Sequence, residues 1–94
     1  MKRFTIHFAG HVQGVGFRST TRNVAMGFRV AGFVRNLSDG RVQVVAEGDE
    51  AELNAFVAGI LDAMRGYVDE HRIESAAATG EFGQPAPGAL TIRR

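Results

Sequence analysis

The chain opens on a strict alternation of apolar and polar side chains. From Arg3 to Phe8, the apolar residues Phe4, Ile6 and Phe8 fall on one side and the residues between them on the other. A period of two residues is typical of a β-strand with one face in a hydrophobic core. The first segment is therefore predicted to be a half-buried strand.

The period lengthens after a glycine-rich stretch, GHVQGVGFRS, at residues 10–19. From Phe17 onward, apolar and small residues recur every three or four positions, which is typical of one face of an α-helix. We therefore expect a helix that packs on the core through Phe17, Thr21, Val24, Ala25 and Phe28.

A hairpin is predicted next. Residues 30–36, VAGFVRN, are rich in β-branched and aromatic side chains, and the apolar positions alternate again over residues 41–47. Between these two segments, Ser38-Asp39-Gly40 is a tight-turn signal. Two neighbouring antiparallel strands follow from this pattern.

The second helix has the most regular pattern in the chain. Asp49 is a suitable N-cap residue, Gly66 marks the end, and apolar residues keep helical spacing at Leu53, Phe56, Val57, Ile60, Leu61 and Met64. Beyond it, residues 71–78 form a weak strand pattern around Ile73. A Gly/Pro loop follows at 80–88, and residues 89–93 can form a short final strand.

The element order predicts an α+β fold, the ferredoxin-like βαββαβ sandwich. Its sheet is mostly antiparallel, with two helices on one face and a short fifth edge strand, and residues 1–94 are expected to form a single domain. A strand–helix–strand crossover makes the first two strands run in the same direction. The glycine-rich stretch and the turn after Asn36 are therefore expected to lie side by side.

Composition narrows the possible functions. The chain has 94 residues, of which 45% are hydrophobic, and its net charge is +1. It is too short for a doubly wound nucleotide-binding fold with a separate substrate domain. Its charge favours neither nucleic acid nor a membrane surface as a partner. The absence of cysteine excludes disulfides and thiolate chemistry. Without a signal-peptide or membrane-span pattern, we expect a cytoplasmic protein.

The glycine-rich stretch has the chemistry of an anion site. Glycines let backbone N–H groups converge, and the start of a helix adds partial positive charge. A nucleotide P-loop would need Gly-Lys-Ser/Thr, whereas this stretch ends Gly16-Phe17-Arg18. A dinucleotide fingerprint would need a third glycine where Ser19 stands. A cradle for one small phosphate remains, with the guanidinium of Arg18 as its cation.

Two motifs together carry a family resemblance. GHVQGVGFR at residues 10–18, and GFVRNLSDGRV at 32–42 followed by Gly48, resemble the motifs of the acylphosphatase family over essentially the whole chain. The resemblance implies hydrolysis of the carboxyl–phosphate bond of acyl phosphates, without metal or cofactor. It also implies that Arg18 binds the phosphate and that Asn36 positions the attacking water. The backbone of the first motif would assist, through Gln13, Gly14, Val15, Gly16, Phe17 and Arg18.

Other interpretations use the same fold. One alternative is a non-catalytic anion- or RNA-binding module, and an RNA binder would need several exposed aromatics on the central strands and a basic sheet face. Another is a regulatory or carbamoyl-phosphate-handling domain of a larger protein, which would be expected to carry zinc-ligand cysteines or further segments. We expect a free-standing monomer that acts on a small acyl phosphate and releases phosphate, with no nucleic acid or membrane partner. His7 and His71 are interpreted as surface residues with no role as metal ligands, and His11 is a candidate to flank the phosphate.

Overall fold

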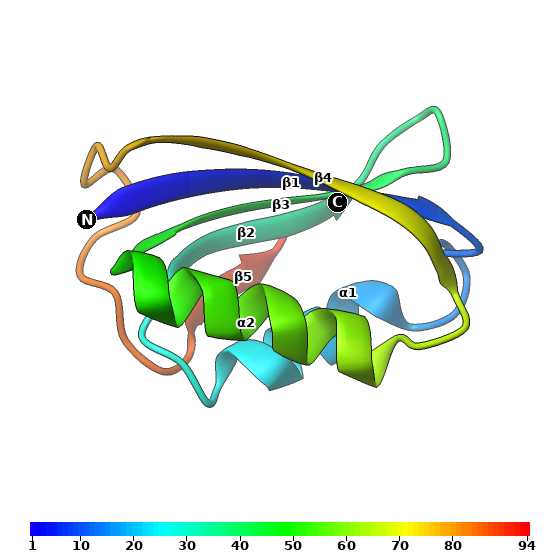
Figure 1. The fold of residues 1–94 in the computed structure, drawn as a ribbon, viewed down its shortest axis with the longest axis horizontal. Coiled ribbons are helices and arrows are strands. Elements are labelled where there is room, and N and C mark those ends of the chain that lie inside the picture. The colour runs from blue at the N-terminus through cyan, green and yellow to red at the C-terminus, as the bar shows by residue number, and fades with distance from the viewer.

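Five strands form one sheet in the order β4-β1-β3-β2-β5, and both helices cover one face of it (Figure 1). The computed structural model describes residues 1–94. This is the predicted ferredoxin-like sandwich, with the short fifth strand at one edge. The elements in chain order are β1 (Lys2–Gly10), α1 (Phe17–Ala25), β2 (Ala31–Asn36), β3 (Val42–Gly48), α2 (Glu50–Ala63), β4 (Val68–Ala77) and β5 (Ala89–Ile92).

Strand direction places the ends of β1 and β2 together. Both strands run antiparallel to β3, which lies between them, so they are parallel to each other. The other neighbours complete a mixed sheet, because β4 is antiparallel to β1 and β5 is parallel to β2. The loop after β1 and the turn after β2 therefore leave the sheet at the same edge, and both lie at the right-hand end of Figure 1.

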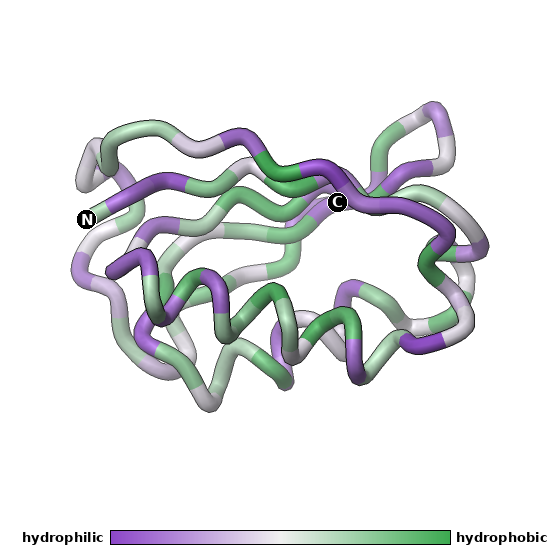
Figure 2. The backbone as a smooth tube through the Cα atoms, viewed as in Figure 1, coloured by the Kyte–Doolittle hydropathy of each residue, from purple (hydrophilic) through white to green (hydrophobic).

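The core lies between the sheet and the helices, as the alternating pattern predicted. Ile6 and Phe8 of β1 are fully buried, as are Leu53 and Phe56 of α2. Figure 2 shows hydrophobic positions along the strands and on α2, whereas β4 is largely hydrophilic. Each large apolar side chain that leaves water stabilises the fold by about 1.5–3 kcal/mol. Neither helix combines the length and the apolar character that a membrane span requires.

Both helices end earlier than their apolar patterns suggest. The α1 helix ends at Ala25, although Phe28 beyond it still packs against the core. The α2 helix ends at Ala63, and the chain turns at Gly66, whose φ is +90°. Asp49 occupies the predicted N-cap position of α2, but its side chain makes no capping hydrogen bond.

The fourth strand differs most from its prediction. It spans Val68–Ala77, three residues earlier at its start than the predicted 71–78, and it pairs with nearly the whole of β1. Almost all of its side chains are exposed, because β4 lies at the edge of the sheet. An exposed strand has no buried face, so its sequence lacks the alternation that reveals a strand.

Candidate active site

A hollow of about 120 Å³ opens at the edge where β1 and β2 end. It lies between the glycine-rich loop, the start of α1 and the end of β2. Arg18 and Asn36 both line it, although Arg18 lies in the first turn of α1 and Asn36 at the end of β2. The residues that line the hollow are Val12, Gly14, Gly16, Phe17, Arg18, Ser19 and Asn36.

Two glycines give the loop its shape. Gly14 and Gly16 have φ values of +78° and +76°, in the left-handed region that side chains other than glycine adopt at a cost. A Cβ atom at either position would meet no protein atom within 4 Å. Backbone conformation, and not crowding by the protein, is therefore what requires glycine here. The space beside both residues is open.

The first turn of α1 borders the same space. Gly16 is the N-cap residue, and its carbonyl accepts the first helical hydrogen bond from Thr20 N–H at 2.9 Å. The backbone N–H groups at the beginning of a helix have no intrahelical partner and carry partial positive charge. Phe17, Arg18 and Ser19 occupy this turn, which contains no acidic side chain. The site is thus electrostatically suited to an anion.

The guanidinium of Arg18 is hydrogen-bonded to the segment that follows β5. Arg18 Nη1 donates a hydrogen bond of 3.4 Å to the carbonyl oxygen of Arg93. Arg93, just past β5, in turn donates its backbone N–H to Val34 O at 2.9 Å, and its guanidinium lies 3.8 Å from the centre of the Phe33 ring. The half-buried Arg18 is therefore oriented by a segment that is distant in sequence.

Asn36 lies at the last position of β2, immediately before the hairpin turn. It pairs with Val42 of β3 and is half-buried. The turn is stabilised by Asp39, which accepts hydrogen bonds from Arg41 N at 3.1 Å and Arg41 Nε at 2.8 Å. Both hydrogen bonds lower the pKa of the Asp39 carboxyl, and the bond from the Arg41 backbone N–H has the larger effect. Asn36 is thus followed directly by an ordered turn.

Four of the six predicted phosphate-binding residues line the hollow, namely Gly14, Gly16, Phe17 and Arg18. The other two do not. Val15 packs against the hydrophobic core, and the Gln13 side chain reaches the hairpin instead. Val12 and Ser19 also line the hollow and were not predicted. Ser19 stands next to Arg18 in the first helical turn, so its position in the motif was the available signal.

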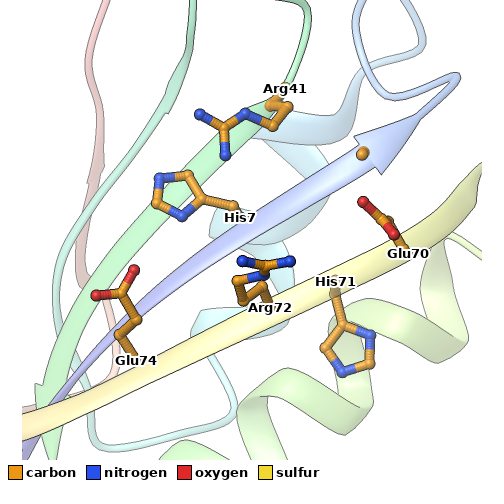
Figure 3. A pocket seen from close by; sticks show the side chains of 7 residues that line it. His7, Arg41, Glu70, His71, Arg72 and Glu74 are labelled. Atoms are coloured by element: carbon orange, nitrogen blue, oxygen red, sulfur yellow. The ribbon is translucent and has the colours of Figure 1, made fainter.

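The three histidines have three different neighbours. His7 Nε2 lies 3.1 Å from Gln43 Nε2, His11 is exposed beside the Tyr67 ring, and His71 stacks on Phe8 with ring centres 6.3 Å apart. Figure 3 shows the rings of His7 and His71 pointing away from each other. His11 is not among the residues that line the site. The structure therefore gives no support to His11 as a flank of the phosphate.

A larger hollow, of about 490 Å³, lies over β1 and β4 (Figure 3). Glu70, Arg72 and Glu74 alternate in charge along β4, and Arg41 at the other side is paired with Asp39. Cations and carboxylates are interleaved in this lining. Such a surface has no net preference for an anion, unlike the acid-free hollow that contains Arg18.

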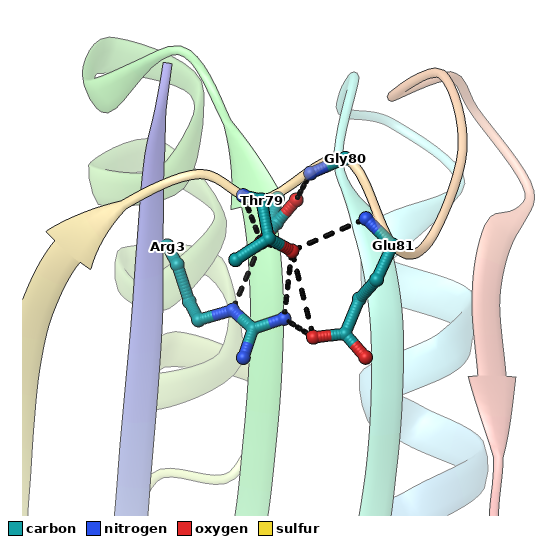
Figure 4. Close-up of polar contacts among 5 residues, drawn as sticks. Arg3, Thr79, Gly80 and Glu81 are labelled. Atoms are coloured by element: carbon teal, nitrogen blue, oxygen red, sulfur yellow. Dashed lines mark hydrogen bonds and ion pairs between the residues drawn. The ribbon is translucent and has the colours of Figure 1, made fainter.

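Away from both hollows, Glu47 is buried in a polar network on the sheet face opposite the helices. It accepts hydrogen bonds from Arg3 Nε, Thr79 N, Thr79 Oγ1 and Gly80 N, each at 2.9 Å. Arg3 also pairs with Glu81, as Figure 4 shows. Burial alone raises the pKa of the Glu47 carboxyl, but the N–H groups of Thr79 and Gly80 and the Arg3 guanidinium outweigh it and lower the pKa to about 2. This network fixes the loop after β4 onto the sheet.

The fold and the site define a ferredoxin-like α+β protein in which a glycine-rich loop and a helix start, both suited to an anion, lie beside an asparagine. Comparison with known proteins is more specific. The model of the acylphosphatase family matches residues 4–84. An acylphosphatase from Syntrophus aciditrophicus (strain SB) is 42% identical over 83 residues, which are 87% of this chain and 86% of that protein.

Solved structures agree. The crystal structure of acylphosphatase from Bacillus subtilis matches over the full length of both chains, with a TM-score of 0.85 and 30% identity. HypF from T. kodakarensis matches all of this chain with a TM-score of 0.78 and 27% identity, but the match covers only 12% of HypF. The chain belongs to the acylphosphatase family.

Proposed function

We propose that this protein hydrolyses acyl phosphates to a carboxylate and inorganic phosphate, with Arg18 and Asn36 as its catalytic residues. The observation that carries the proposal is that these two side chains, from different elements, line the same hollow. Membership of the acylphosphatase family supports the reaction. The loop from Gln13 to Arg18 contributes backbone, with Gly14, Gly16, Phe17 and Arg18 nearest the phosphate.

Arg18 and the loop amides have an electrostatic role. The guanidinium offers a planar pair of donors that matches two phosphoryl oxygens and stays charged at every working pH. Phosphoryl transfer passes through a loose transition state with charge spread over the phosphoryl oxygens. Fixed donors that face those oxygens therefore lower the barrier without reorganisation. The hydrogen bond to Arg93 O pre-orients the guanidinium for this task.

Asn36 has a positioning role towards water. A side-chain amide cannot act as a strong base, but its oxygen can accept a hydrogen bond from water and align it with phosphorus. The leaving carboxylate has a conjugate acid with a pKa of about 4, so no general acid is needed to protonate it. The phosphate group of the substrate itself accepts the proton of the attacking water. The reaction thus requires neither a metal ion nor a cofactor.

We extend the proposal to the setting of the protein: a single functional domain over residues 1–94, monomeric and cytoplasmic, without a nucleic acid partner. A net charge of +1 gives no general attraction to nucleic acid. Phe33, the aromatic of the central strands on the face opposite the helices, is only 7% exposed, with Phe82 and Arg93 against its ring. A base has little surface to stack on there, which argues against the RNA-binding alternative.

Two substitutions separate the roles of the catalytic pair. With benzoyl phosphate as substrate and inorganic phosphate as competitive inhibitor, Arg18→Ala should lower kcat/KM by about 10²–10³-fold, because a donor to the transition state is lost. Inhibition by phosphate should weaken in parallel. Asn36→Ala should lower kcat by about 10²-fold with little change in phosphate inhibition, because water alignment alone is lost.

Matched controls lie on the exposed side of α1. Arg22→Ala removes the same charge one turn beyond Arg18, and Asn23→Ala removes the same amide, so both should keep wild-type kinetics. If Arg22→Ala lowered kcat/KM as much as Arg18→Ala, the effect of Arg18 would come from its contribution to the net charge and not from contact with the phosphate. A large loss of phosphate inhibition in Asn36→Ala would contradict its assignment to water.

A further inference from the structure

The two walls of the candidate active site are joined by one side chain. Gln13 Nε2 lies 2.8 Å from Leu37 O and 3.0 Å from Arg41 O, at the two ends of the hairpin turn. Both neighbours are carbonyl oxygens, which only accept, so the two hydrogens of the amide nitrogen donate one bond to each. The side chain is half-buried between loop and turn.

These two carbonyls also close the turn itself. Arg41 O accepts a hydrogen bond from Leu37 N at 2.8 Å, and Leu37 O accepts one from Gly40 N at 3.2 Å. The Gln13 amide therefore completes a small network that holds the hairpin in one geometry. No backbone hydrogen bond crosses from the glycine-rich loop to the hairpin. The hydrogen bonds between the loop and the hairpin are therefore those of the Gln13 side chain.

We call the two hydrogen bonds from Gln13 to Leu37 O and Arg41 O the tether. At both of its ends the tether is one residue away from a residue that lines the hollow. Gln13 precedes Gly14, which lines the hollow, and Leu37 follows Asn36. Gly14 and Gly16 leave the loop with little intrinsic stiffness, and Asn36 belongs to a different strand. A displacement of about 1 Å between reacting groups can lower a rate by about 10²-fold. The distance between phosphate and attacking water thus depends on how firmly the loop and the hairpin are held together.

We infer that Gln13 is a positioning residue for the reaction: its side chain aligns the Asn36-bound water with the phosphate held by Gly14–Arg18. The inference rests on the proposed function and deepens it. Gln13 does not touch the substrate through its side chain, which is directed to the hairpin. It acts through Asn36, and this determines how its loss should appear in kinetics.

A double-mutant cycle tests the inference. Gln13→Met keeps the length of the side chain and removes both hydrogen bonds. It should lower kcat about tenfold or more, with the inhibition constant of phosphate changed less than about threefold, because the cradle remains while the water is misaligned. In an Asn36→Ala background the same substitution should cost less than about twofold, because the group it positions is gone.

Gln13→Glu adds a pH readout. Above the pKa of the new carboxyl, a carboxylate would face two carbonyl oxygens without a proton to share. At pH 7 the kcat of the Gln13→Glu protein, relative to wild type, should therefore be lower than that of the Gln13→Met protein. As the pH falls toward 5, the carboxyl gains a proton that it can donate, and the relative kcat of Gln13→Glu should rise. Gln43→Met is the matched control. It is an equally half-buried glutamine whose amide contacts Arg35 and His7 on the sheet, and it should keep wild-type kcat.

Opposite results would overturn the inference. An equal loss from Gln13→Met in both backgrounds would show that it does not act through Asn36. A parallel weakening of phosphate inhibition would make Gln13 a phosphate ligand instead. If the wild type does not hydrolyse benzoyl phosphate, the proposed function is wrong. The hydrogen bonds of Gln13 can still be tested separately, by amide hydrogen exchange. Leu37 N–H should exchange faster in Gln13→Met than in Gln43→Met, and equal exchange would mean that no tether exists.

Discussion

At the scale of single residues, Thr21 stands out as a buried hydroxyl without a hydrogen-bond partner. It faces the core from α1, four residues after Phe17, and its Oγ1 atom is fully buried. An unsatisfied buried polar group costs about 1–3 kcal/mol relative to one that is hydrogen-bonded. The helical pattern identified Thr21 as a core position, but only the structure shows that its hydroxyl is unpaired.

Thr21→Val should therefore stabilise the protein by about 1 kcal/mol, because a methyl group of similar shape replaces the unpaired hydroxyl. Urea unfolding monitored by circular dichroism measures the change. Thr20→Val, on the same helix but only half-buried, makes the same chemical change and should alter stability by less than about 0.5 kcal/mol. A loss of stability in Thr21→Val alone would indicate that the hydroxyl has a partner, such as an internal water.

Residue types predicted that Arg18 and Asn36 lie close together, but they did not predict side-chain directions. Arg18 and Asn36 stood out in the sequence because their chemistry is specific, and both line the hollow. Gln13 and Val15 were expected at the phosphate through their backbone, but the motif does not say where their side chains point. The tether from Gln13 to the hairpin depends on tertiary packing, which no local pattern encodes. The carbonyl of Arg93 that orients Arg18 carries no side-chain signal at all.

At the scale of elements, the sheet face opposite the helices is organised around Glu47 of β3. Its carboxylate joins Arg3 of β1 to the N–H groups of the loop after β4. The alternation of β3 places Glu47 on the face away from the core, yet it is only 2% exposed because the loop after β4 covers it. Sequence periodicity identifies the two faces of a strand but does not reveal a loop that folds over one of them.

The Glu47 network should make stability depend on pH. The pKa of its carboxyl is about 2 in the folded protein, against an ordinary value of 4.5. The stabilisation is therefore complete above pH 4.5 and is lost as the pH falls through about 2. Glu47→Gln should destabilise the protein by roughly 3 kcal/mol at pH 7, with a smaller difference from wild type at pH 3.

Urea unfolding at the two pH values measures this difference. Glu81→Gln removes the other carboxylate that pairs with Arg3, but Glu81 is 55% exposed. An exposed ion pair contributes at most about 1 kcal/mol, so this control should change stability little at either pH. The same destabilisation by Glu47→Gln at pH 7 and pH 3 would mean that its ionisation does not stabilise the fold.

The fourth strand shows the limit of prediction at this scale. Elements with one buried face, such as β1 and α2, were predicted close to their observed bounds because burial imposes a period on the sequence. The edge strand β4 has no such constraint, and its first residues, Val68 to Glu70, were missed. Backbone pairing with β1 keeps this strand in the sheet, and backbone pairing leaves no mark on side-chain pattern.

At the scale of the whole molecule, topology creates the site. The crossover through α1 makes β1 and β2 parallel, with β3 between them, so a loop and a hairpin meet at one edge of the sheet. This juxtaposition was predictable from the element order. The same fold occurs as a free-standing acylphosphatase in Bacillus subtilis and as a small part of HypF, so the paired residues at that edge, and not the fold alone, carry the proposed chemistry.

The most direct test is hydrolysis of benzoyl phosphate in the presence of EDTA by the wild-type protein and Arg18→Ala, measured side by side. The wild type should release phosphate far above the spontaneous rate, because the carboxylate leaves without help from a metal ion. The Arg18→Ala protein, folded by circular dichroism, should be slower by about 10²–10³-fold. A wild-type rate equal to the spontaneous rate, or an unchanged rate in Arg18→Ala, would contradict the assignment of this hollow as the active site.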